Sequence, residues 1–232
     1  MFRNLPPVTK NLLLINFVVF LFDAVFQKFG IRFAQYIDYS VLFGLNYCTP
    51  FGFHFWQPVT YMFMHANFSH IFCNMFAVLM FAPALEQSWG ARRFTIYYFI
   101  CGIGAAAIQM LVWALFSPGM PAVTIGASGA VFGVLFAFAW LFPDVPMFIF
   151  FIPIPIRART LVLIYAVIEL LAGISGAGNV AHFAHLGGML FGWLVILWWR
   201  HSDHWHFPKL GRRKEKDDDA SQFDGWHYQK PL

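Results

Sequence analysis

The chain has 232 residues, of which 59% are hydrophobic and 11% charged, and its mean hydropathy is +0.62. A soluble domain carries about 25% charged residues, and here 13 of the 26 charges fall in the last 33 residues. This distribution excludes a soluble enzyme, a nucleic-acid-binding protein and a disordered chain, and it predicts a polytopic membrane protein.

Six apolar segments follow one another along the chain, and each approaches the roughly 20 residues that a helix needs to cross a bilayer. They cover residues 11–27, 69–87, 94–116, 127–142, 160–173 and 182–199. The uncharged stretch 94–143 is too long for one pass, and Ser117-Pro118-Gly119 divides it. Lipid permits only helices or closed barrels, and the alternation of barrel strands is missing. We therefore predict an all-α bundle of six transmembrane helices.

Six spans place both chain ends on one side of the membrane. With the N- and C-termini cytoplasmic, 13 of the 15 Lys and Arg residues lie on the cytoplasmic side. The two on the other side are Lys28 and Arg32. This asymmetry follows the positive-inside rule and supports the orientation. We expect a membrane domain over 1–200 and a polar, mobile cytoplasmic tail over 201–232.

The first loop, 28–68, is unusually aromatic for a segment outside the spans. Aromatic side chains gather at the headgroup level of a bilayer. The loop is therefore expected to lie in or on the outer leaflet.

Four polar residues inside the spans fall at similar depth. Ser128 and His185 each lie 14 residues before the cytoplasmic end of their span, which is roughly 21 Å at 1.5 Å per residue. His70 and Asn74 lie roughly 26 and 20 Å above the cytoplasmic end of their span, 69–87. A serine and a histidine at one depth on different helices can form a nucleophile and its general base.

The sequence around Ser128 suits this chemistry. Gly126-Ala127-Ser128-Gly129 opens a short helix, where free backbone N–H groups can hold a developing oxyanion. Two pairs of small residues predict that the fourth and sixth helices approach closely. These pairs are Gly129 with Gly133, and Gly188 with Gly192.

Each polar residue also has a structural interpretation. Asn74 could tie two helices together. His182 and His185 have the spacing of a zinc pair, but HExxH is absent and no third ligand is obvious, so no metal is predicted. Asp23 and Glu169 are expected to be helix–helix ties or loop anchors, because neither shares a motif with the serine layer.

Three motifs together resemble those of the rhomboid intramembrane serine proteases, in the family's order and over residues 11–199. They are His70-Ile71-Phe72-Cys73-Asn74, Gly126-Ala127-Ser128-Gly129, and Ala184-His185-Leu186-Gly187-Gly188 with Gly192. The resemblance implies a Ser–His dyad without a third acid, in which Ser128 is the nucleophile and His185 the base. It also implies an oxyanion site of the Ser128 N–H, His70 and Asn74, and a six-transmembrane-helix rhomboid bundle.

Two positions depart from the family pattern. Many relatives carry Trp-Arg in the first loop, where this chain has Trp56-Gln57. Bacterial relatives often have a tyrosine that stacks on the histidine, and here that position is Phe132, which can stack but cannot hydrogen-bond. Phe132, and Gly126 from the serine motif, are counted with His70 and Asn74 as oxyanion and substrate-binding residues.

The resemblance implies hydrolysis, without cofactor, of a peptide bond in or near a transmembrane segment of single-pass or polytopic membrane proteins. The expected partners are these substrates and the lipid bilayer, and the expected location is a bacterial inner membrane. One alternative is a catalytically silent relative that binds transmembrane helices. A small transporter is a weaker alternative, since the chain shows no convincing inverted repeat.

Overall fold

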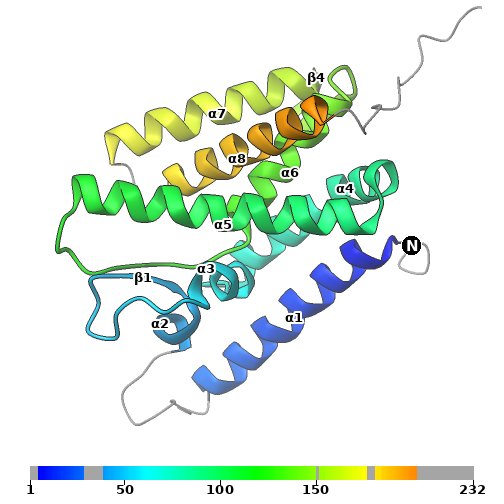
Figure 1. Cartoon of the computed structure of the whole chain (residues 1–232). Helices are drawn as coiled ribbons and strands as arrows, with labels where there is room; N and C mark the ends of the chain where they lie inside the picture. Colours follow the sequence, from blue (N-terminus) through cyan, green and yellow to red (C-terminus); the bar gives the residue numbers. More distant parts are fainter. Residues whose placement is uncertain (1–4, 29–38, 150–151, 177–180, 203–232) are drawn as a thin grey trace, which may run out of the picture.

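The computed structural model describes residues 5–28, 39–149, 152–176 and 181–202. Its framework consists of six helices (Figure 1). They are α1 (Pro7–Lys28), α4 (Phe68–Trp89), α5 (Ala91–Phe116), α6 (Ser128–Leu141), α7 (Ala158–Ser175) and α8 (His182–His201). Within the described residues, five are long and apolar enough to cross a membrane, and α6 is a shorter apolar helix of 14 residues. The predicted all-α membrane bundle is confirmed, and each predicted segment agrees with its helix to about one turn.

Short elements that were not predicted connect these helices. They are α2 (Tyr39–Phe43), β1 (Leu45–Tyr47), α3 (Gln57–Thr60), the 3₁₀ helix η3 (Tyr61–Phe63), β2 (Ala122–Thr124), β3 (Pro146–Ile149) and β4 (Ile152–Arg157). Strand β1 pairs antiparallel with β2, and β3 pairs antiparallel with β4. Much of the aromatic first loop is therefore regular structure, although residues 29–38 lie outside the described part of the chain. The expected polar tail also lies outside it from residue 203 onward.

Helix α8 packs against both α5 and α6. A Cβ atom at Gly188 would overlap the carbonyl group of Gly129, so only glycine permits this approach of α8 to α6. A Cβ at Gly133 would lie 3.1 Å from the Gly188 carbonyl oxygen. Gly192 instead faces the Tyr97 hydroxyl of α5, because α8 packs against both helices. The predicted close contact of α6 and α8 is thus present, with Gly192 serving α5.

A buried carboxylate holds the beginning of α1. Glu86 of α4 accepts hydrogen bonds from Val8 N at 2.9 Å, Thr9 N at 2.7 Å and Thr9 Oγ1 at 2.8 Å. The first N–H groups of a helix have no partner within the helix, and a negative charge there also complements the helix dipole. Glu86 therefore fixes the start of α1 against α4.

The first turn of α1, the α4–α5 junction, β4 and the last turn of α8 lie at the same end of the bundle (Figure 1). The basic residues near these elements are Lys10, Arg92, Arg93, Arg157, Arg159 and Arg200. Elements β1 and α2 lie toward the opposite end. The arrangement places the predicted cytoplasmic charges together, and the direction of the termini stays a prediction.

Candidate active site

Ser128 is the first residue of α6, directly after the segment that contains β2. Gly126 has φ +134°, a conformation that favours glycine, and its N–H donates a 2.9 Å hydrogen bond to the Tyr61 carbonyl oxygen. Among the described residues, no side chain caps the beginning of α6. The backbone N–H groups around Ser128 are thus available to a ligand.

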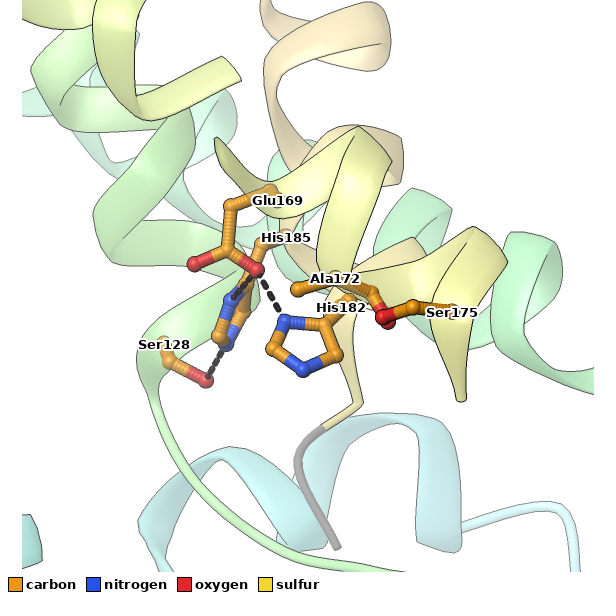
Figure 2. A network of polar contacts seen from close by, with 6 residues as sticks. All are labelled: Ser128, Glu169, Ala172, Ser175, His182 and His185. Atoms are coloured by element: carbon orange, nitrogen blue, oxygen red, sulfur yellow. Dashed lines mark hydrogen bonds and ion pairs between the residues drawn. The ribbon is translucent and has the colours of Figure 1, made fainter. Parts of the chain in front are cut away.

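His185 brings its imidazole to this helix end. Its Nε2 lies 2.8 Å from Ser128 Oγ, although the residues are 57 positions apart in the sequence (Figure 2). The residue is 7% exposed. With the ring proton on Nδ1, the serine hydroxyl donates to Nε2, which is the arrangement that a nucleophile and its base require.

Two aromatic side chains fix the orientation of this imidazole. Phe132 lies one turn after Ser128 on α6, and its ring stacks on His185 with 4.3 Å between centroids and 8° between planes. Tyr165 of α7 in turn packs edge-on against the ring of Phe132, with 6.4 Å between the two ring centroids. The substitution of Phe for the family's tyrosine therefore preserves the stacking.

His70 lies in the first turn of α4, where Asn67 caps the helix by accepting a 2.9 Å hydrogen bond from His70 N. The N–H of Ala66 approaches His70 Nδ1 at 3.4 Å. Since Nδ1 accepts, the ring proton lies on Nε2. A Cβ at Gly126 would lie 2.8 Å from that Nε2 and 3.6 Å from Ser128 Oγ, so both atoms flank this glycine.

Asn74 lies one turn further along α4, and its Nδ2 donates a 3.0 Å hydrogen bond to the His70 carbonyl oxygen. The amide has a second N–H to offer. One cavity of about 750 Å³ brings together all six residues that the sequence predicts for the site. They are His70, Asn74, Gly126, Ser128, Phe132 and His185. The remainder of this cavity is mainly apolar and extends between α4 and α7, past Phe76, Phe81 and Leu161.

The model of the rhomboid domain matches residues 52–202 of this chain. The chain belongs to the rhomboid family. It is 31% identical over 209 residues to the chloroplastic rhomboid-like protein 11 of Arabidopsis thaliana, covering 81% of this chain and 63% of the relative. It is 31% identical over 137 residues to the mitochondrial rhomboid protein 1 of Saccharomyces cerevisiae, covering 57% and 40%. It is 33% identical over 98 residues to rhomboid-like protease 3 of Toxoplasma gondii, covering 41% and 34%.

This rhomboid spans between 34% and 63% of the length of these three relatives. It is a multi-pass membrane protein, as the predicted spans require. Two of the three relatives are named chloroplastic and mitochondrial, so they give no support to the expected bacterial inner membrane.

The rhomboid site contains one residue that was not predicted to belong to it. Glu169 of α7 was expected to be a helix–helix tie or a loop anchor. It does tie α7 to α8, and it does so at the site: its Oε2 lies 2.9 Å from Nδ1 of His185 and 2.6 Å from Nδ1 of His182 (Figure 2). The signal was present in the sequence, because Glu169 is the sole charged residue in the span 160–173. An ionisable group at that depth is costly and marks a functional position. Asp23 of α1 does not line the cavity.

Two residues of the first loop that were not predicted as site residues are buried. Gln57 replaces the family's arginine, and its Oε1 accepts hydrogen bonds from Asn46 N at 3.3 Å and His54 N at 3.1 Å.

His65 is 2% exposed, and its ring lies 5.0 Å from the ring of His70. Burial, and then the nearby His70, lower the pKa of His65 to about 4. A neutral His65 therefore packs behind His70.

Proposed function

We propose that this rhomboid is an intramembrane serine endopeptidase in which Ser128 is the nucleophile and His185 the general base. The observation that carries the proposal is the 2.8 Å contact between Ser128 Oγ and His185 Nε2. Oγ attacks the substrate carbonyl carbon while Nε2 accepts the hydroxyl proton. His185 then returns that proton to the leaving amine, and an acyl-enzyme remains. Water hydrolyses this ester by the same proton path.

The negative oxygen of the tetrahedral intermediate needs donors that are already in place. The donors proposed for it are the backbone N–H of Ser128, Nε2–H of His70 and the second N–H of Asn74, from three residues that line the same cavity. Gly126 leaves room for the oxyanion between them, since a side chain there would meet the His70 ring. No metal or other cofactor is required for this reaction.

The cavity favours a substrate that is itself apolar. Its polar end carries the reacting groups, and its apolar part between α4 and α7 can receive hydrophobic side chains. The proposed substrates are single-pass or polytopic membrane proteins, cut in or near a transmembrane segment. We further propose that the membrane domain covers 1–200, that 201–232 is a cytoplasmic tail, and that both termini are cytoplasmic, as the charge distribution predicts.

Covalent labelling by a fluorophosphonate tests the nucleophile without knowledge of the natural substrate. The purified, lipid-reconstituted protein should be labelled on Ser128 and should cut a single-pass reporter, and Ser128→Ala and His185→Ala should abolish both activities. Ser88→Ala is the control, because Ser88 of α4 only donates to the carbonyl oxygen of Ala84, outside the cavity.

Three outcomes would contradict the proposal. A folded wild-type protein without labelling or cleavage would indicate a silent relative that binds transmembrane helices. Substrate flux across proteoliposomes would indicate a transporter. Cleavage that persists in Ser128→Ala and stops on chelation would indicate a metal mechanism.

A further inference from the structure

We infer that Glu169 is a positioning residue for His185, so that this rhomboid uses a Ser128–His185–Glu169 relay in place of a dyad. The inference rests on the proposed protease function and adds a third group to it. The three residues come from three helices, α6, α8 and α7, and they meet beside the cavity (Figure 2).

The distances define the direction of the relay. Oε2 of Glu169 lies 2.9 Å from Nδ1 of His185, and Nε2 of the same ring lies 2.8 Å from Ser128 Oγ. The side chains of His185 and Glu169 are only 9% and 12% exposed. The carboxylate is therefore on the side of the imidazole that faces away from the nucleophile, and little water competes for it.

The carboxylate selects the tautomer of the base. A neutral imidazole carries one proton, and a carboxylate oxygen beside Nδ1 favours that proton on Nδ1, because two facing lone pairs would repel. Nε2 is then unprotonated and can accept the proton of Ser128. Among the described residues, Nδ1 of His185 has no aligned hydrogen-bond partner, so the resting contact with Oε2 is electrostatic. Such contacts commonly tighten in the substrate complex.

The same carboxylate also acts after proton transfer. When His185 accepts the serine proton it becomes an imidazolium, and a positive charge in a poorly hydrated site is costly. A carboxylate at 2.9 Å offsets that charge without leaving its position. Glu169 therefore lowers the energy of the step that forms the tetrahedral intermediate, and it does so without touching the substrate.

His182 keeps the carboxylate in place. Its Nδ1 lies 2.6 Å from the same Oε2, and it is located one turn before His185 on α8. Ligands of a tetrahedral zinc ion, at about 2.0–2.1 Å from the metal, lie roughly 3.3 Å from one another. The separations of 2.6 and 2.9 Å are shorter than this, and they fit a hydrogen bond with His182 and an electrostatic contact with His185 at one oxygen. We therefore interpret the cluster of Glu169, His182 and His185 as a relay and not as a metal site.

The test compares a partly buried and a buried carboxylate that receive the same isosteric change. Glu169→Gln removes the charge from the relay, whereas Glu86→Gln removes a charge that only holds the start of α1. The measurements are kcat and KM on a single-pass reporter, the rate of fluorophosphonate labelling, and the thermal midpoint in detergent. A fourth measurement is the ¹⁵N NMR signal of His185, assigned by its loss in His185→Gln, which reports the tautomer.

For Glu169→Gln we expect kcat and the labelling rate to fall at least about tenfold, with KM and the thermal midpoint near the wild-type values. The fraction of His185 with its proton on Nδ1 should also fall, because an amide can turn its NH₂ toward that nitrogen. Glu86→Gln should lower the thermal midpoint. At temperatures below that midpoint, kcat and the tautomer of His185 should be unchanged. Glu169→Asp, which keeps the charge but shortens the side chain, should retain an intermediate rate.

Unchanged kcat in Glu169→Gln would overturn the inference, as would a loss of rate that follows the thermal midpoint while the tautomer stays constant. If Glu169→Gln does not fold, wild-type kcat and tautomer in Glu169→Ala, which also lacks the carboxylate, would overturn the inference equally. Activity that disappears on chelation and returns with Zn²⁺ would identify the three residues as metal ligands. Failure of the protease function itself is distinguishable, since then the wild-type protein would not be labelled on Ser128.

Discussion

The ring of Phe132 lies parallel to the imidazole of His185, at 4.3 Å between centroids. Phe132 is one helical turn after Ser128. The helix that supplies Ser128 thus also supplies the ring against which His185 packs. Movement of α6 relative to α8 would disturb both contacts at once, which explains why glycines hold these two helices so close.

Replacing Phe132 with alanine should reduce kcat by about 2- to 10-fold. Ring stacking contributes about 0.5–1.5 kcal/mol beyond burial, and about 1.4 kcal/mol corresponds to a factor of ten in rate. Phe132→Tyr should retain the wild-type rate because the stacking surface is the same. Reporter cleavage in proteoliposomes measures both. Equal rates for the alanine and tyrosine variants would show that the stacking does not position His185.

His70→Ala and Asn74→Ala should each lower kcat by about 100- to 1,000-fold, the usual cost of losing one oxyanion donor. KM should change little, since these donors act on charge that develops after binding. Steady-state kinetics on a reporter gives both constants. If the two variants turn over normally, His70 and Asn74 serve only to tie helices together.

Gly126→Ala should reduce activity far more than stability. Its backbone has φ +134°, and an added Cβ would lie 2.8 Å from the His70 imidazole. Gly119→Ala is the matched control, because Gly119 also has a positive φ of 77° but an added Cβ would meet nothing within 4 Å. Cleavage rates and thermal midpoints of the two variants separate backbone strain from displacement of His70. Similar rates would mean that the space beside Gly126 is not used.

The sequence predicts the six helices and the pairing of Ser128 with His185, because span length and distance from a span end are one-dimensional quantities. It does not predict Glu169 beside His185, since this contact depends on how α7 is rotated about its axis against α8. The antiparallel pairing of β1 with β2 cannot be predicted from the sequence for another reason. Each strand has three residues, too few for a visible alternation, and Leu45 pairs with Thr124 from a distant part of the chain.

His65 should make the folded protein less stable as the pH falls. Its pKa in the fold is about 4, below the ordinary value of 6.5, so between these values the unfolded chain binds more protons than the folded one. Stability contributed by neutral His65 is complete above about pH 6.5 and is lost toward pH 4, by up to about 1.4 kcal/mol for each pH unit. Thermal unfolding in detergent at several pH values, compared with His65→Asn, isolates this contribution. A pH dependence that is the same in both proteins would refute it.

Substrates should be cut near the outer boundary of their transmembrane segment. Ser128 begins a 14-residue helix. With the termini cytoplasmic, as proposed, it lies about 20 Å from the inner end of a hydrocarbon core of about 30 Å. A helical substrate must unwind before its carbonyl can be reached, and Gly or Pro favours unwinding. Mass spectrometry of both fragments of a doubly tagged reporter locates the cut. A cut in the inner third, or a rate unaffected by replacing Gly and Pro with Leu, would refute the argument.

The contact between Ser128 and His185 across 57 residues has a consequence for biosynthesis. Translation delivers α6 before α8, so a growing chain exposes Ser128 to the membrane while the segment that carries His185 is still in the ribosome. Such an incomplete chain holds a serine of ordinary reactivity. If the proposed function holds, peptidase activity can arise only after α8 has packed against α5 and α6. Incomplete chains would then not cleave neighbouring membrane proteins.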